Sequence, residues 1–229
     1  MKIRWLPRES IARRASEVLQ DYEQVVAHPV HPPIPVEDII ERCLGLNLSF
    51  EDLETRLGMG DVLGAIFVEF KEITIDKKLL DDKSEGRMIF TCAHEAGHWV
   101  LHRHFVEQAA RKGAKGYGII CRKRDARLPE EWQADYFASC LLMPEQKVVG
   151  AFSQVWGGKE MVLDNARSRL GGTSVCVDPC VENWPLIADA VRDAGRFSNV
   201  SKEAMIIRLK ELGLVRNKTQ APMGWRRTA

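Results

Sequence analysis

Two histidines and a glutamate stand together in the sequence HEAGH, residues 94–98. On an α-helix, His94 and His98 would lie about one turn apart on one face, so both imidazoles could bind the same metal ion. Glu95 would point about 100° away from His94, outside the ligand set and within reach of a water at the ion. The pattern therefore indicates a hydrolytic metal site. A solvated helix, or two buried histidines with backbone partners, would fit the same few letters.

A catalytic zinc site also needs a third protein ligand and an open position for water. The segment EEWQADYFASCLLMP, residues 130–144, places Glu131 and Asp135 four residues apart on a second predicted helix, opposite its apolar side. One carboxylate could bind the ion, and the other could accept the ring N–H of a ligand histidine and so fix its orientation. Taken by itself, this helix would also fit an acidic, solvated face. Beside HEAGH, a metal site is the better interpretation.

Both motifs lie on segments with helical periodicity. An apolar stripe predicts one helix over 85–102, and a proline in the first turn predicts another over 128–142. Small residues on these helices, Gly97 and Ala134 among them, would allow the two to pack closely. The basic, glycine-containing stretch 104–127 is expected to be a loop.

The remaining segments predict a small sheet and further helices. Periodicity indicates helices at 10–27, 36–44 and 201–213, and strands at 46–50, 62–70 and 73–75. We expect the strands to form a small antiparallel meander. Residues after 145 have a mostly helical pattern, so the fold class is expected to be α+β.

Composition limits the class of protein. The chain has 229 residues, is 45% hydrophobic and 28% charged, and carries a net charge of +1, which is ordinary for a soluble globular protein. Its most basic cluster, 122–127, is expected to be a solvated loop. No apolar run reaches the ~20 residues of a membrane span, and the N-terminus lacks a signal-peptide core. A cytoplasmic protein without membrane contact is therefore expected.

The six cysteines are scattered along the chain and are expected to be thiols in a reducing compartment. Cys176 and Cys180 form the one close pair. Two sulfurs supply half of a structural zinc site, so we expect a loop with unpaired thiols, with a disulfide or a metal clip as the alternatives.

Together these motifs resemble the ImmA/IrrE family of metallo-endopeptidases. The resemblance rests on HEAGHWVLH followed by E-x-x-A-D-x-F-A-x-x-L-L-M-P, on the strands GAIFVEF and EITID, and on Ser201, Ala204 and Arg208-Leu209 near the C-terminus. It covers about residues 10–150 and 195–215 and leaves 150–195 uncovered. The resemblance implies a zincin-like metalloprotease core over 1–148, with the small antiparallel sheet packed on the HEAGH helix. A mainly helical region, 149–229, would follow.

The resemblance also implies roles for the site residues. It implies Zn²⁺, or another divalent ion such as Mn²⁺, held by His94, His98 and Glu131. Glu95 would be the catalytic base, and Asp135 would be the partner of a ligand histidine. The expected reaction is hydrolysis of a peptide bond.

A developing oxyanion needs the metal and one more donor. The candidates are His102, Tyr117 and Tyr136, and His102 would otherwise line the cleft. The sequence leaves this choice open.

The resemblance implies an intracellular endopeptidase that acts on a regulatory protein. The expected partner is a repressor with a helix-turn-helix domain or an antitoxin, encoded nearby and often in a mobile element such as a prophage. The alternative is a non-proteolytic metal-binding regulator that binds a repressor or DNA through its C-terminal region. Because the charges of SKEAMIIRLKELGLVR, 201–216, are mixed, direct DNA binding is not expected.

Overall fold

A computed structural model gives the fold and describes residues 5–80, 85–111, 120–122, 128–157, 160–163, 166–170, 173–178 and 183–217. Within these ranges the backbone alone is described for 105–111, 120–122, 163–170, 173–178, 183–184 and 217. The chain divides into two compact units. One comprises Met1–Pro144 with Phe197–Ser201, and the other comprises Glu145–Arg196 with Lys202–Ala229. The predicted boundary after residue 148 falls inside a helix of the second unit.

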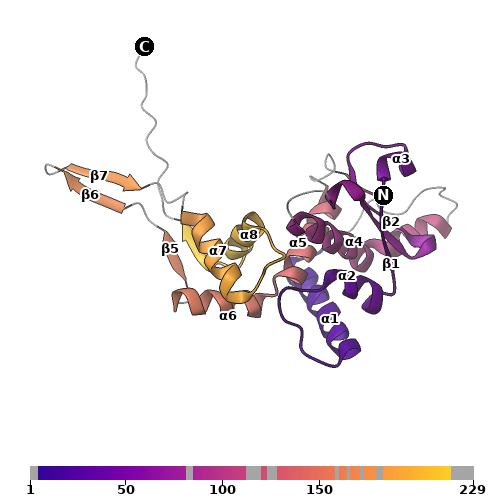
Figure 1. Ribbon diagram of the computed structural model, residues 1–229, viewed down its shortest axis with the longest axis horizontal. Helices are drawn as coiled ribbons and strands as arrows, with labels where there is room; N and C mark the ends of the chain where they lie inside the picture. Colours follow the sequence, from indigo (N-terminus) through magenta and orange to yellow (C-terminus); the bar gives the residue numbers. More distant parts are fainter. Residues whose placement is uncertain are drawn as a thin grey trace, which may run out of the picture. The chain divides into compact units, whose positions relative to one another are not determined.

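The helices of the first unit are α1 (Arg8–Val26), α2 (Val36–Asp38), α4 (Glu85–Arg111) and α5 (Pro129–Leu142). The structure confirms the helix predicted at 10–27, because α1 buries the apolar stripe of the sequence at Ile11, Ala15, Val18 and Tyr22. The helix predicted at 36–44 begins as α2 and continues as a π-helical turn, η1 (Ile39–Cys43). In the first unit, α5 packs against both α1 and α4 (Figure 1).

The sheet of the first unit is mixed. Its described strands are β1 (Asn47–Glu51), β2 (Val62–Phe67), β3 (Glu72–Asp76) and β4 (Ile120–Arg122), in the order β1-β3-β2-β4. Strand β2 is antiparallel to both β3 and β4, as the predicted meander requires. Strand β1 runs parallel to β3, so the antiparallel prediction is wrong there. Helix α3 (Leu53–Leu57) and β2 lie between β1 and β3 in the chain, and such a long connection lets a strand return in the same direction.

The two faces of the sheet have different partners. Ile73 and Ile75 of β3 stand opposite Ile66 and Gly64 of β2, and all four are buried. Side chains alternate between the faces of a strand, so these residues share one face. Helix α4 contacts both β2 and β3. The sheet therefore packs on the helix that carries HEAGH, as predicted.

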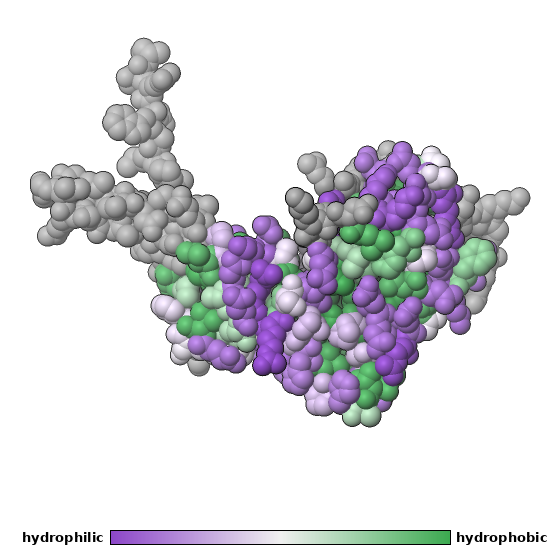
Figure 2. All heavy atoms as spheres, in the orientation of Figure 1, coloured by the Kyte–Doolittle hydropathy of each residue, from purple (hydrophilic) through white to green (hydrophobic). Residues whose placement is uncertain are grey.

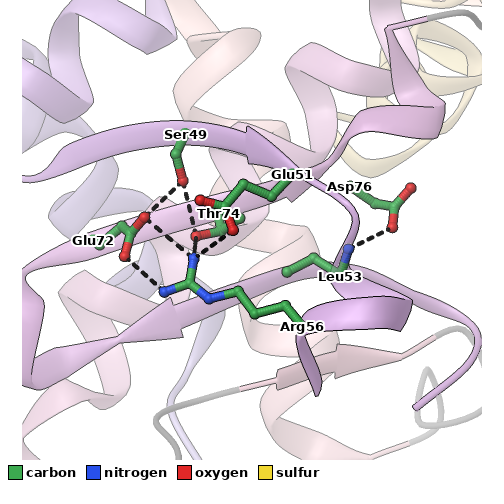
Figure 3. Close-up of polar contacts among 7 residues, drawn as sticks. All are labelled: Ser49, Glu51, Leu53, Arg56, Glu72, Thr74 and Asp76. Carbon is green, nitrogen blue, oxygen red and sulfur yellow. Dashed lines mark hydrogen bonds and ion pairs between the residues drawn. The ribbon is translucent and has the colours of Figure 1, made fainter. Parts of the chain in front are cut away.

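Polar contacts hold α3 against the other face of the sheet (Figure 3). The guanidinium of Arg56 lies 3.1 Å from Glu72 Oε2 and 3.0 Å from Glu51 Oε2, and it also donates to Thr74 Oγ1 at 3.2 Å. Buried Asp76 accepts from the backbone N–H of Leu53 at 3.2 Å. The network joins α3 to β1 and β3.

The sequence predicts a loop over 104–127, but the structure contains a helical part and a strand there. Helix α4 continues to Arg111, and Ile120–Arg122 pair with β2 as β4. Residues 112–119 and 123–127 lie outside the described part of the chain. The basic cluster predicted to be a loop falls mostly there.

The second unit contains α6 (Glu145–Trp156), α7 (Asn183–Gly195) and α8 (Lys202–Glu211), with α7 in contact with both of the others. These helices confirm a mostly helical C-terminal region, and α8 corresponds to the helix predicted at 201–213. Two strand pairs were not predicted. β5 (Met161–Leu163) runs parallel to β8 (Val215–Asn217), and β6 (Ala166–Leu170) is antiparallel to β7 (Thr173–Asp178).

A short segment late in the sequence completes the first unit. Phe197–Ser201 belong to that unit, and Asn199 Nδ2–H donates to the carbonyl of Ile34 at 3.0 Å. The segment also lies against the first turn of α4, because a Cβ on Gly86 would be 3.2 Å from Ser201 N. The start of α4 is therefore packed against backbone that follows α7 in the chain.

The surfaces of both units mix hydrophilic and apolar residues. Hydrophilic and apolar residues are interspersed on the visible face of each unit (Figure 2). Exposed apolar side chains of the second unit include Trp156, Leu186 and Ile207. Among the helices in the described residues, none has both the length and the apolar composition that crossing a membrane requires.

Candidate metal centre

Close packing of α4 on α5 brings the two motifs together. A Cβ on Gly97 would lie 3.0 Å from Phe137 Cδ1 and 3.1 Å from the carbonyl oxygen of Ala134. Glycine at 97 therefore lets the helices approach closely, and Ala134 is itself fully buried. These are the small residues that the sequence indicated for this contact.

The imidazoles of His94 and His98 and the carboxylate of Glu131 converge. Each offers one ligand atom, and these atoms all lie within 4.8 Å of one another. His94 Nε2 is 3.2 Å from Glu131 Oε2, and His98 Nε2 is 3.3 Å from Glu131 Oε1. All three residues are buried. The alternative of an acidic, solvated face on α5 therefore does not hold for Glu131, which faces α4 instead of solvent.

The chemistry of this donor set fits a metal ion. Two imidazole nitrogens and one carboxylate oxygen are a recurrent ligand set of catalytic zinc. The buried Nε2 of His98 makes no hydrogen bond within the described residues, although Glu131 lies beside it. An unsatisfied buried nitrogen is costly, and coordination of a cation would use its lone pair.

The protonation states of the ligand residues also suit a cation. Burial lowers the pKa of His98 to about 4, so its imidazole is neutral near pH 7. Burial opposes ionisation of Glu131, but its contacts with His94 and His98 outweigh that effect and hold its pKa at about 2. A neutral imidazole and an ionised carboxylate are the forms that bind metals.

Asp135 lies on the outer side of His94. His94 Nδ1–H donates to Asp135 Oδ1 at 2.8 Å, which leaves Nε2 directed toward Glu131. Of the two carboxylates singled out from the sequence, Glu131 thus stands among the possible ligand atoms and Asp135 orients a histidine. Such a partner fixes the tautomer and the orientation of the ring.

Glu95 is fully buried beside this group. Neither of its carboxylate oxygens makes a hydrogen bond within the described residues. Burial raises its pKa to about 8, with His94 opposing the shift and Glu131 adding to it. A carboxyl group in this environment holds a proton near neutral pH and releases it when positive charge is close.

Comparison with protein families agrees with this geometry. Residues 70–162 match the family model Peptidase_M78, described as the IrrE N-terminal-like domain. These residues are similar to the IrrE N-terminal-like domain. The matched span contains HEAGH, Glu131 and Asp135, and it confirms the resemblance to the ImmA/IrrE family. The match indicates a peptidase, with a buried His/His/Glu group able to hold a metal ion. No curated protein matched the chain.

Gly64 lies directly beside Glu95, and it was not among the site residues predicted from the sequence. A Cβ on Gly64 would lie 2.3 Å from Glu95 Oε1, so the carboxylate occupies space that only glycine leaves open. The pairing of β2 with β4 is also irregular between Val62 and Gly64. A lone glycine within a strand signals a bulge or a close approach, and that signal was present in GAIFVEF.

The remaining predicted site residues have different outcomes. His102 does not line a cleft, because it is fully buried and its ring nitrogens face His98 and Gln133. Tyr136 is partly exposed, and its ring stacks on Trp132 with the guanidinium of Arg8 5.4 Å from its centre. Tyr117 lies outside the described residues.

The three cysteines whose side chains the structure describes take no part in the ligand group. Cys43, Cys92 and Cys140 are free thiols, as expected, and burial raises the pKa of Cys92. Cys180 and the side chain of Cys176 lie outside the described part.

Proposed function

We propose that this chain is a zinc-dependent endopeptidase in which His94, His98 and Glu131 hold the metal and Glu95 is the catalytic base. One observation carries the proposal: three buried ligand atoms lie within 4.8 Å of one another, beside a fully buried glutamate whose oxygens make no hydrogen bond in the described residues. A purely structural metal site would have no use for that carboxylate. The match to a peptidase family supports the same reaction class.

Zinc in this ligand set would polarise a peptide carbonyl and lower the pKa of water. The residues of the chain would handle protons and orientation. A Glu95 carboxylate oxygen takes a proton from the attacking water and returns it to the nitrogen of the leaving amine. Asp135 holds the Nδ1–H of His94, so that Nε2 keeps its lone pair for the metal.

We propose that the substrate is an intracellular regulatory protein, a helix-turn-helix repressor or an antitoxin encoded near this gene. The support is the sequence resemblance to the ImmA/IrrE family. The competing hypothesis is a non-proteolytic metal-binding regulator that binds a repressor or DNA through its C-terminal region. The Glu95 carboxyl beside the ligand group favours the peptidase.

The test is to incubate the purified protein with the product of the neighbouring gene and to follow cleavage by mass spectrometry. Wild type should cleave, a chelator should abolish cleavage, and added Zn²⁺ should restore it. Glu95→Gln should retain zinc but lose activity, because the amide cannot accept the proton. We expect a loss of at least about 100-fold, at the lower end of what general base catalysis contributes.

Glu85→Gln is the matched control, since Glu85 is an exposed glutamate in the first turn of the same helix. It should cleave at the wild-type rate. Glu95→Gln with wild-type cleavage would refute the catalytic role of Glu95. Binding of the partner by both proteins with cleavage by neither would favour the non-proteolytic regulator.

A further inference from the structure

Three buried polar side chains form a line behind His98. His98 Nδ1 lies 3.0 Å from His102 Nδ1, and His102 Nε2 lies 3.3 Å from Gln133 Oε1. His98, His102 and Gln133 are all fully buried. The line runs from α4 to α5, on the side of His98 opposite the nitrogen that faces Glu131.

One premise fixes the direction of both hydrogen bonds. If His98 gives its Nε2 lone pair to a metal, the neutral ring carries its proton on Nδ1. His98 Nδ1–H then donates to His102 Nδ1, so the proton of His102 must be on Nε2. That N–H donates to Gln133 Oε1. In this direction, each N–H donor in the line faces an acceptor.

The reverse direction fails at Gln133. If His98 carried its proton on Nε2, its Nδ1 would accept from His102 Nδ1–H. His102 Nε2 would then be a lone pair facing the carbonyl oxygen Oε1 of Gln133, and two buried acceptors would meet without a proton between them. A buried acceptor without a donor costs on the order of 1–3 kcal/mol. With its Oε1 facing His102 Nε2, the amide of Gln133 thus favours the tautomer of His98 that can bind a metal.

We propose that His102 and Gln133 are positioning residues for the metal ligand His98, and that they fix its tautomer and ring orientation through this line of hydrogen bonds. The inference rests on the proposed metal-binding function. It gives each histidine ligand a partner of its own. The partner of His94 is the half-exposed carboxylate of Asp135, whereas the partner of His98 is neutral and fully buried.

The burial of the site explains the difference between the two partners. An unpaired carboxylate behind His98 would have no contact with water, and burying such a charge is expensive. A neutral imidazole anchored by an amide fixes the ring without adding charge. The negative charge among the three ligands then stays on Glu131.

The first test measures zinc affinity by competition with a chelator of known affinity, which requires no substrate. His102→Leu leaves His98 Nδ1–H without an acceptor and should weaken zinc binding 10–100-fold, the usual effect of losing such a partner. His102→Gln can accept from His98 and donate to Gln133, so its affinity should stay within about threefold of wild type. His104→Leu, a change at an exposed position of the same helix, should leave it unchanged.

Equal affinities of His102→Leu and wild type would overturn the inference, as would equal weakening by His102→Leu and His102→Gln. The latter result would mean that the ring serves only for packing. Thermal unfolding of the metal-free variants separates loss of fold from loss of affinity. Absence of zinc binding by wild type would refute the proposed function together with the inference.

The second test reads the tautomer directly by ¹⁵N NMR of the histidine rings. In the zinc-loaded protein, the proton should be on Nδ1 of His98 and on Nε2 of His102. In the metal-free protein, Gln133→Leu should release the preference of His102 for that tautomer, while Gln133→Glu should preserve it. Gln133→Leu should also weaken zinc binding. A proton on Nδ1 of His102 in the wild-type protein would overturn the inference independently of any affinity.

Discussion

Gly64 shows how little space the structure leaves around Glu95, the proposed catalytic base. The hydrogen that glycine carries in place of a Cβ is what allows Glu95 Oε1 to lie where it does. No charge or hydrogen bond is involved, only the volume of one methyl group. A change at Gly64 should therefore shift the carboxylate of Glu95 while His94, His98 and Glu131 remain intact.

Gly64→Ala should reduce peptide hydrolysis about 100-fold, because a shift of ~1 Å in a reacting group can have that effect. Zinc affinity should remain close to wild type, since the new methyl group meets Glu95 and not a ligand atom. Steady-state kinetics with parallel chelator competition would measure both quantities.

Gly60→Ala is the control for this change, because a Cβ at exposed Gly60 would meet no atom within 4 Å. It should be as active as wild type. Undiminished hydrolysis by Gly64→Ala would show that Glu95 can move without consequence, and would count against its role as a fixed base.

Among the helices and strands, α3 owes its position to a charged group. Arg56 contacts the carboxylates of Glu51 and Glu72, and its guanidinium stacks 3.9 Å from the centre of the Phe67 ring. The Arg56 hydrogen bond is the main cause that lowers the pKa of Glu72. Because the folded-state pKa is below the unfolded value, this pair stabilises the fold above the ordinary Glu pKa and loses its effect as pH falls through the folded value.

Arg56→Met keeps an apolar contact with Phe67 and removes the charge. We expect the free energy of unfolding to fall by about 1–3 kcal/mol at pH 7, the cost of removing the charged donor of a largely buried carboxylate that keeps its hydrogen bond from Ser49. The difference from wild type should narrow below about pH 4.5, as Glu72 becomes protonated in both proteins. Urea unfolding at several pH values would measure it.

Arg13→Met removes an exposed ion pair with Glu17 and serves as the control, with an expected change within about 0.5 kcal/mol. A pH-independent difference between wild type and Arg56→Met would mean that packing on Phe67, and not the ion pair, stabilises α3.

Most helices, and the pairing of HEAGH with Glu131, could be predicted because their signals are local. Residues four apart share a helix face whatever the fold. The end of α4 was missed because the lysines and glycines after 111 suggested a loop, although FVEQAAR, 105–111, contains mostly good helix formers. The direction of β1 and the pairing of β5 with β8 depend on contacts between distant segments, which no local pattern encodes.

The same limit applies to the site itself. His94, His98, Glu131 and Asp135 were found from spacing on two helices. Gln133 gave no signal, because its role depends on a ring that another helix brings to it. The prediction that His102 lines a cleft failed for a similar reason. Helical spacing places His102 on the same face as the two other histidines, but only the packing of α5 shows that its side chain is buried against Gln133.

Two separate segments of the chain make up the first unit. It leaves that unit after Pro144, forms α6 and α7, and returns for Phe197–Ser201 before α8 begins. Phe197 and Val200 are buried, and Asn199 donates to Ile34. The unit that contains the ligand residues is thus not a continuous stretch of sequence.

Asn199→Ala in the full-length protein should lower the free energy of unfolding by about 0.5–1.5 kcal/mol, because it removes a buried hydrogen bond to the Ile34 carbonyl. Amides in the first turn of α4 should also exchange faster, since that turn lies against the same segment. Asn47→Ala, at an exposed position of β1, is the control. Unchanged exchange at the start of α4 would show that residues 197–201 do not hold it.

The return of the chain at residues 197–201 also bears on how the protein is made. Translation proceeds from the N-terminus, and domains commonly fold as they emerge from the ribosome. Here the helix that bears HEAGH is synthesised before α6 and α7, but the segment against its first turn is synthesised only after them. A nascent chain that stops short of residue 201 therefore holds every proposed ligand residue without the complete unit around them, and the proposed protease activity would await the synthesis of α6, α7 and the segment that follows them.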